Sequence, residues 1–247
     1  MLNNEIVIEG ASFSFKCVTL NNDNLEDICQ RIQTKGDIFN PDTETPGFHD
    51  FCLDSGVIKG YYSVIVPFEV THFVEGNLTK SLFKRMDSCE FMITPKLIYI
   101  WGKPSAARFF CEALSAVTGQ HVENCEFDFE TMSRLQGRMT VIKAIVVENP
   151  KDKPIRRARL TGHMEDYDSY NIVDPRNHEI DNISGLVETP LGWMKLTVAK
   201  KGKITLGVKK GLAISSDNLN WIMDLVTNEQ MPQITELVPG ASENAPF

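Results

Sequence analysis

The chain has 247 residues, of which 42 % are hydrophobic and 23 % charged, and its formal net charge is −8 at pH 7. This hydrophobic fraction is too high for intrinsic disorder, and the length allows one large domain or two smaller ones. No stretch approaches the roughly 18 uninterrupted apolar residues of a transmembrane helix, and the first residues lack the features of a signal peptide. We therefore expect a soluble, cytoplasmic globular protein without a membrane partner.

The first 36 residues predict two strands and a helix. Residues 5–9 and 12–20 are separated by Gly10, and apolar side chains alternate with polar ones in the second stretch. Asn24 is one of several candidate N-caps for the helix that follows. The apolar residues of this helix recur at helical spacing and are Leu25, Ile28, Cys29 and Ile32.

The middle of the chain predicts a long connection, a long strand, a hairpin and a second helix. Residues 37–56 are rich in Asp, Pro, Gly and Thr and have no clear period, which is typical of a connection. Residues 61–74 alternate and are rich in β-branched side chains, as in a strand. The hairpin is expected at 90–101 and the helix at 105–117, with Gly119 in the position of a left-handed C-cap.

The C-terminal part predicts further strands and a last helix. Residues 140–147 are almost continuously apolar, which is typical of a buried strand, and 155–164 predict the next one. A hairpin is expected at 193–208 and a helix at 217–227. A shorter helix is expected at 127–135.

These elements predict an α+β fold, with antiparallel hairpins in one or two curved sheets and helices on one face. A hairpin followed by a helix occurs in both parts of the chain, which favours two pseudo-symmetric halves. The expected organisation is an N-terminal half at 1–125, a C-terminal half with basic hairpins at 126–230, and a flexible tail at 231–247.

Positive charge is concentrated between residues 150 and 210. This stretch has twelve Lys or Arg against eight Asp or Glu, whereas the rest of the chain has thirteen against twenty-five. Basic side chains and a tryptophan on neighbouring strands can hold a phosphate backbone and stack on a base. The candidate residues are Arg157, Arg159, Trp193, Lys195, Lys200, Lys201, Lys203, Lys209 and Lys210. Lysines of this kind also keep sheet edges soluble and unpaired.

The leading interpretation is a non-enzymatic binding protein whose basic region, 150–210, binds nucleic acid or an acidic protein surface. A second interpretation is a hydrolase or nuclease that depends on a divalent metal, because imidazole and carboxylate ligands gather between His163 and Asp181. Its candidate ligands are His163, Glu165, Asp166, Asp168 and His178. A polar surface loop has the same composition. A third interpretation is a structural subunit of a homo- or hetero-oligomer.

The remaining motifs predict neither catalytic residues nor a cofactor. The six cysteines lie twelve to thirty-seven residues apart without a CxxC pair, which favours buried thiols over a zinc site. His49, Asp50 and Asp54 form a small group in which the histidine could act as a general base. The chain has no GxSxG, GxxxxGK[ST] or GxGxxG motif, so serine-hydrolase, P-loop and dinucleotide-binding signatures are missing.

Overall fold

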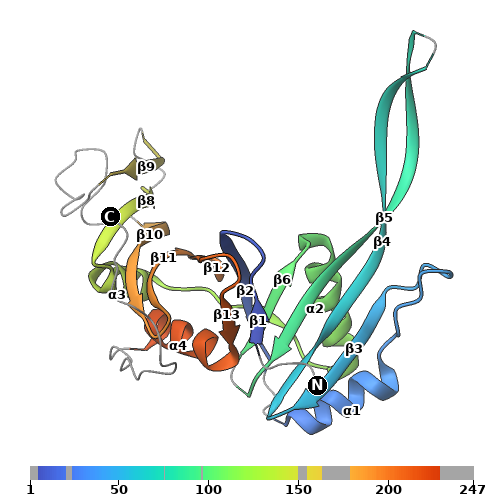
Figure 1. The fold of residues 1–247 in the computed structure, drawn as a ribbon, viewed down its shortest axis with the longest axis horizontal. Coiled ribbons are helices and arrows are strands. Elements are labelled where there is room, and N and C mark those ends of the chain that lie inside the picture. The colour runs from blue at the N-terminus through green and yellow to red at the C-terminus, as the bar shows by residue number, and fades with distance from the viewer. Residues whose placement is uncertain are drawn as a thin grey trace. The chain divides into compact units, whose positions relative to one another are not determined.

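The computed structural model describes residues 5–20, 24–74, 76–95, 97–149, 155–162 and 179–228. These residues form four helices and antiparallel sheets, which confirms the α+β prediction. Contacts divide the chain into two compact units. Residues 15–125 are called the N-terminal unit, and residues 1–14 with 126–247 the C-terminal unit (Figure 1). None of the helices within the described ranges is long and apolar enough to cross a membrane.

The N-terminal unit is built on a five-stranded sheet with the order β3-β4-β5-β6-β2, and the short β7 pairs with β2. Helices α1 and α2 pack on one face of this sheet. The elements are β2 (Ser12–Thr19, which starts in the C-terminal unit), α1 (Leu25–Lys35), β3 (Gly47–Asp54), β4 (Val57–Val74), β5 (Asn77–Ile93), β6 (Ile98–Gly102), α2 (Pro104–Thr118) and β7 (Glu123–Asn124).

Aromatic rings fill the core between this sheet and its helices. Phe110 of α2 is fully buried, and its ring stacks on that of Phe91 at a centroid distance of 4.6 Å. The rings of Phe48 and Tyr62 meet it edge-on. Helix α1 begins after Asn24, whose side-chain oxygen accepts a hydrogen bond from the backbone N–H of Asp27. Its predicted apolar stripe is buried, and the prediction for both helices is confirmed.

The prediction of a connection over residues 37–56 is wrong in its second half, where β3 pairs with β4. The pairing register shifts between His49 and Cys52, and Asp50 between them has a positive φ of 48°. A bulge of this kind inserts an extra residue into the strand, so the alternation of polar and apolar side chains is lost. The period-2 pattern that predicts a strand is therefore missing from the sequence.

Strands β4 and β5 continue well beyond the rest of their sheet. β3 pairs with β4 only as far as Ser63, and β6 pairs with β5 only as far as Cys89. Beyond these points residues 64–74 and 77–88 pair with each other alone, and together they are called the arm. Figure 1 shows the arm as a twisted two-stranded ribbon leading away from α1 and α2.

Asp87, at the base of the arm, is 1 % exposed, and its carboxylate accepts hydrogen bonds from the hydroxyl of Ser105 and from Arg85. The Ser105 hydrogen bond, with a smaller contribution from Arg85, lowers the pKa of the Asp87 carboxyl. The ionised carboxylate therefore stabilises the fold above the ordinary aspartate pKa. This contribution is lost as the pH falls through the lowered value.

We expect Asp87→Asn to be less stable than the wild type at neutral pH, with a difference that shrinks below about pH 3.9. Urea unfolding of both proteins at several pH values measures this difference. A difference in midpoint that does not depend on pH would contradict the assignment.

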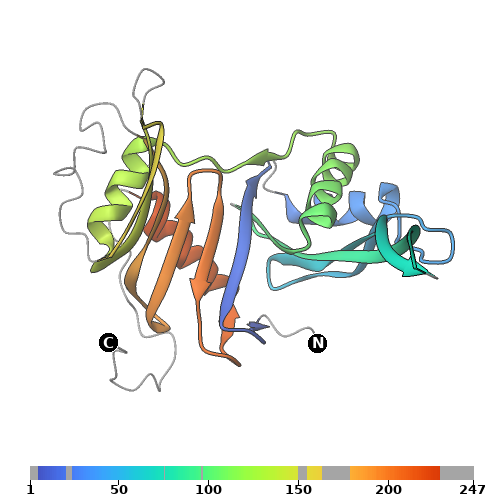
Figure 2. The same cartoon turned by 90° about the horizontal axis from the view of Figure 1, so that it is seen from above.

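The C-terminal unit has a sheet with the order β12-β11-β10-β8-β9 and a separate pair, β1 with β13. Helices α3 and α4 contact each other, and α3 contacts β10; Figure 2 shows α4 behind the strands of this sheet. The elements are β1 (Glu5–Val7), α3 (Phe129–Arg138), β8 (Val141–Glu148), β9 (Arg157–Thr161), β10 (Glu179–Thr189), β11 (Gly192–Ala199), β12 (Lys203–Gly207), β13 (Ala213–Ser215) and α4 (Ser216–Thr227).

Candidate functional site

The sheet of the C-terminal unit has one buried and one partly exposed face, because side chains alternate along each strand. The buried face is apolar and includes Met194, Leu196 and Val198 of β11. The alternate residues of the same strand, such as Lys195 and Thr197, are exposed or half-buried. This second face, which extends over β9, β8, β10, β11, β12 and the start of β2, is called the open face.

Pairing register brings several of the predicted basic residues onto the open face. Residues directly opposite each other point to the same side of a sheet. Arg159 pairs with Val146, which pairs with Asn182, which in turn pairs with Ala199. Along β11, Thr197, Lys195 and Trp193 precede Ala199 at steps of two residues, so they point to the same side as Ala199. Thr197 also pairs with Thr205 of β12, and Lys203 lies two residues before Thr205 on the same side. Arg157, Arg159, Trp193, Lys195 and Lys203 therefore share this face.

Hydroxyl groups occupy the centre of the open face. The Ser184 and Thr197 hydroxyls are 2.8 Å apart, and those of Ser14 and Thr205 are 2.7 Å apart. These side chains are short, so the middle of the face offers hydrogen-bonding groups without bulky obstruction. The sequence did not predict this group, because its members come from four separate strands.

Two of the predicted cations are neutralised by carboxylates. Arg157 bonds to Asp181 and approaches Glu148 at 3.9 Å. The ammonium of Lys200 lies 2.6 Å from Glu179, and this hydrogen bond raises the pKa of Lys200. Partners this close neutralise most of the charge of Arg157 and Lys200, so these two side chains offer less positive charge than the sequence alone indicates.

The other predicted cations have no carboxylate partner within the described ranges. Arg159, Lys195 and Lys203 lie on the open face, and all three are exposed. Lys201 lies in the β11–β12 turn, whereas Lys209 and Lys210 follow the opposite end of β12. From a strand spacing of about 4.8 Å and a rise of about 3.3 Å per residue, the Cα atoms of Lys195 and Lys203 are roughly 14 Å apart.

Trp193 begins the row of exposed side chains on β11 and is 40 % exposed. It pairs with Glu188 on β10, and Lys195 follows it two residues later on the same face. An exposed indole ring beside a lysine can stack on a planar ligand while the ammonium meets a negative group. Between residues 155 and 210, the described segments contain nine Lys or Arg and three Asp or Glu.

The predicted metal ligands cannot be placed, because His163, Glu165, Asp166, Asp168 and His178 all lie outside the described residues. Asp181, at the edge of that cluster, is bonded to Arg157. Elsewhere in the described chain, no group of three or more His, Cys, Asp or Glu is arranged to hold a metal ion. The metal-dependent interpretation remains a prediction.

A polar network around His49 extends beyond what its sequence neighbours predict. The Nδ1 atom of His49 is 2.9 Å from Asp50 Oδ2, and its Nε2 atom is 2.8 Å from Ser63 Oγ. Ser63 Oγ is in turn 2.7 Å from Ser88 Oγ. Asp54 lies apart and bonds to Ser55. Ser63 is fully buried, so no substrate reaches its hydroxyl. The network instead supplies hydrogen bonds to this buried polar group between β3, β4 and β5.

The expectation of buried thiols holds for Cys17, Cys29 and Cys89, whereas Cys52, Cys111 and Cys125 are half-buried. Burial raises the pKa of Cys89 to about 12 and that of Cys125 to about 11. The same cause raises the pKa of Cys17 well above its ordinary value. The thiolate is the reactive form of cysteine, so these three thiols are mostly protonated and unreactive at neutral pH.

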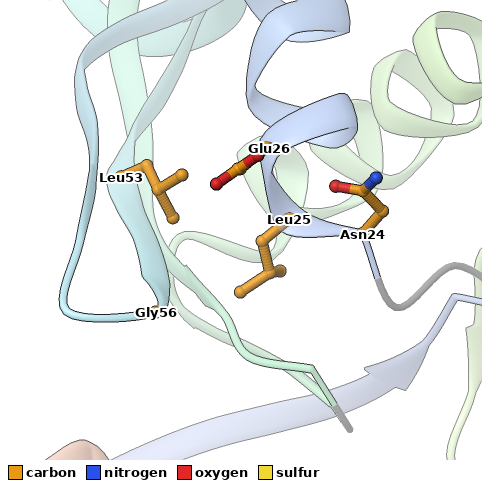
Figure 3. A pocket seen from close by; sticks show the side chains of 5 residues that line it. All are labelled: Asn24, Leu25, Glu26, Leu53 and Gly56. Carbon is orange, nitrogen blue, oxygen red and sulfur yellow. The ribbon is translucent and has the colours of Figure 1, made fainter.

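A shallow hollow of about 580 Å³ lies at the start of α1, next to the β3–β4 turn. Leu25 and Leu53 lie on either side of it, with Gly56 at the turn (Figure 3). Its polar lining consists of Asn24, which caps α1, and Glu26 in the first turn of that helix. One carboxylate beside a helix cap does not define a catalytic or metal-binding chemistry.

No protein-family model matches the chain, and no curated protein matches it. Among the described residues, the open face combines unpaired cations, an exposed aromatic ring and hydroxyl groups on a single surface.

Proposed function

We propose that the protein binds single-stranded nucleic acid on the open face of its C-terminal unit. The observation that carries this proposal is the sharing of one sheet face by Trp193, Lys195, Lys203 and Arg159, three of them cations without a carboxylate partner in the described segments. Proteins that hold single strands without sequence preference combine a positive surface with aromatic rings on which bases stack.

In this proposal the cations and the central hydroxyl groups of the open face bind different parts of the nucleic-acid backbone. Lys195 and Lys203 meet phosphates by charge, since each ammonium is exposed and flexible. The hydroxyls of Thr197 and Thr205 lie between them, and each is hydrogen-bonded to a serine hydroxyl. In each pair one hydroxyl uses its proton within the pair, and the other has its proton left for a sugar or phosphate oxygen. These contacts are indifferent to base identity, so the proposed binding tolerates many sequences.

A single strand is favoured over a duplex because of Trp193. An indole on a sheet surface stacks on a base only when that base is unstacked from its neighbours. The net charge of −8 does not oppose the proposal, because the acidic residues are concentrated outside the 150–210 stretch.

Fluorescence anisotropy with a labelled single-stranded oligonucleotide over a salt series tests the proposal. Each phosphate contact contributes a slope of about 0.7 to the dependence of log affinity on log salt for single strands. We therefore expect the double variant Lys195→Gln, Lys203→Gln to bind more weakly and to lower this slope by about 1.4. Lys35→Gln, which removes one exposed cation in the N-terminal unit, is the matched control and leaves the slope unchanged.

Removal of the stacking ring gives a second and independent readout. Trp193→Ala is expected to weaken single-strand binding by about 5- to 150-fold, since a stacked base contributes roughly 1–3 kcal/mol, and to leave the salt slope as it is. Absence of binding at the lowest salt, or equal binding by all variants, would refute the proposal. Displacement by polyglutamate as efficient as displacement by the oligonucleotide would assign the face to an acidic protein instead.

A further inference from the structure

The arm carries a large share of the exposed apolar surface in the described chain. Of the thirteen large hydrophobic residues that are exposed among the described residues, seven lie on the arm. A two-stranded ribbon without a third strand is only marginally stable in water. The arm packs on the core only at its base, through Val64 and Val66, so the apolar surface of its outer part is exposed to solvent.

Four of these seven side chains lie on one face of the arm. Phe73 pairs with Leu78, Glu69 with Leu82, and Ile65 with Met86. These pairs are separated by even numbers of residues along each strand, so their side chains point to the same side. The exposed fractions are 73 % for Phe73, 67 % for Leu78, 71 % for Leu82 and 57 % for Met86. This surface is called the apolar face of the arm.

The size of the apolar face fits a protein interface. With about 200 Å² for a large side chain, its four residues expose on the order of 500 Å². A standard interface buries about 800 Å² on each partner, of which roughly 60 % is non-polar, so its apolar share is also about 500 Å². One such face supplies the apolar surface that one side of a stable dimer needs.

We propose that the apolar face packs against the same face of a second copy of this chain. Two arms that point in the same direction, related by a two-fold axis parallel to their strands, place β4 of one over β5 of the other. Paired residues lie at the same height along the arm, so Phe73 meets the second copy's Leu78, and Ile65 meets the second copy's Met86. Every contact occurs twice, as in isologous dimers.

The charges of the apolar face suit this arrangement. Glu69 lies over the second copy's Leu82. On the same face of that β5 strand, Lys80 lies two residues before Leu82 and is therefore close to Glu69 of the first copy. Lys80 in turn lies over the second copy's Thr71, so no like charges are directly opposed. Within one chain the Lys80 ammonium already lies 2.8 Å from Glu69, and in the dimer each lysine stands between two glutamates. Lys84 is held by Glu44 of its own chain.

The charge of the whole arm also favours a second copy over a charged partner. Residues 64–88 contain three acidic and three basic side chains, whereas the chain as a whole has a net charge of −8. A neutral surface does not recruit an anionic membrane or an oppositely charged protein by electrostatics. It does allow two otherwise acidic chains to approach each other at this point.

Sedimentation velocity over a range of protein concentrations tests the proposal. We expect a monomer–dimer equilibrium whose dissociation constant rises at least tenfold in Leu82→Ser. Ile38→Ser is the matched control, because Ile38 is a 55 % exposed aliphatic residue outside the arm, and it leaves the constant unchanged. Both positions are exposed, so circular dichroism should show an intact fold in each variant.

Exchanging the charges at positions 69 and 80 tests whether the partner of the apolar face is a second copy of this chain. Glu69→Lys and Lys80→Glu each place like charges across the interface and weaken their own dimers, whereas an equal mixture of the two restores dimerisation through heterodimers. The double variant Glu69→Lys, Lys80→Glu dimerises by itself. A chain that is monomeric at all concentrations overturns the proposal, and so does a dimer that is insensitive to Leu82→Ser or a mixture that forms no heterodimers.

Discussion

Replacement of Phe110 by alanine is expected to lower the free energy of unfolding by about 3–5 kcal/mol, the usual cost of removing a buried phenylalanine. The ring is fully buried and contacts the rings of Phe48, Tyr62 and Phe91. The cavity would lie where α2 meets β3, β4 and β5, and none of these rings can fill it without leaving its own place. Urea denaturation followed by circular dichroism measures the change.

Phe129→Ala serves as the comparison for this variant. Phe129 is 48 % exposed at the start of α3, so its removal leaves no enclosed cavity and is expected to cost less than half as much. Equal losses in the two variants would show that Phe110 does not anchor α2 to the sheet.

Gly185→Ala is expected to destabilise the sheet that carries the open face by about 1–3 kcal/mol, as overpacking of a core usually does. A Cβ atom at this position would lie 2.5 Å from Met139 Sδ and 2.6 Å from the backbone oxygen of Val141. The methionine can move, but the Val141 oxygen belongs to β8, which pairs with β10 at this point. Relief of the clash therefore requires a shift of one strand against the other.

Gly137→Ala is the matched control for the substitution itself. Gly137 lies within α3, and a Cβ atom there would have no neighbour within 4 Å. In a helix, alanine in place of glycine is expected to stabilise by up to about 1 kcal/mol. The two Gly→Ala changes should therefore shift the denaturation midpoint in opposite directions, and a Gly185→Ala protein that is as stable as the wild type would refute the predicted clash.

Much of the secondary structure follows from the sequence because its causes are local. The stripe of α1 repeats every three to four residues and starts next to a capping asparagine, and the positive φ of 71° at Gly119 ends α2 as its position predicts. The last helix begins at a capping box of Ser215 and Asn218. In each case the residues that decide the element lie within one helical turn of its ends.

The elements that the sequence did not predict depend on distant partners. β3 contains a bulge that hides its alternation, and the first half of β5 is a strand because β4 pairs with it over its whole length. β13, which the sequence also did not predict, pairs with β1, more than 200 residues away in the chain. Pairing between strands that are far apart in the sequence depends on tertiary packing, and the local alternation of side chains does not reveal it.

For the candidate site, too, some properties follow from the sequence and others depend on the tertiary structure. The sequence alone determined that positive charge and a tryptophan gather in one stretch of alternating strands, since composition and alternation are visible without a fold. Only the tertiary structure decided which cations remain available. Arg157 meets Asp181 and Lys200 meets Glu179 across neighbouring strands, whereas Lys195 and Lys203 do not meet a carboxylate among the described residues. The physical reason is that a charge is neutralised by its neighbours in space, and strand register sets those neighbours.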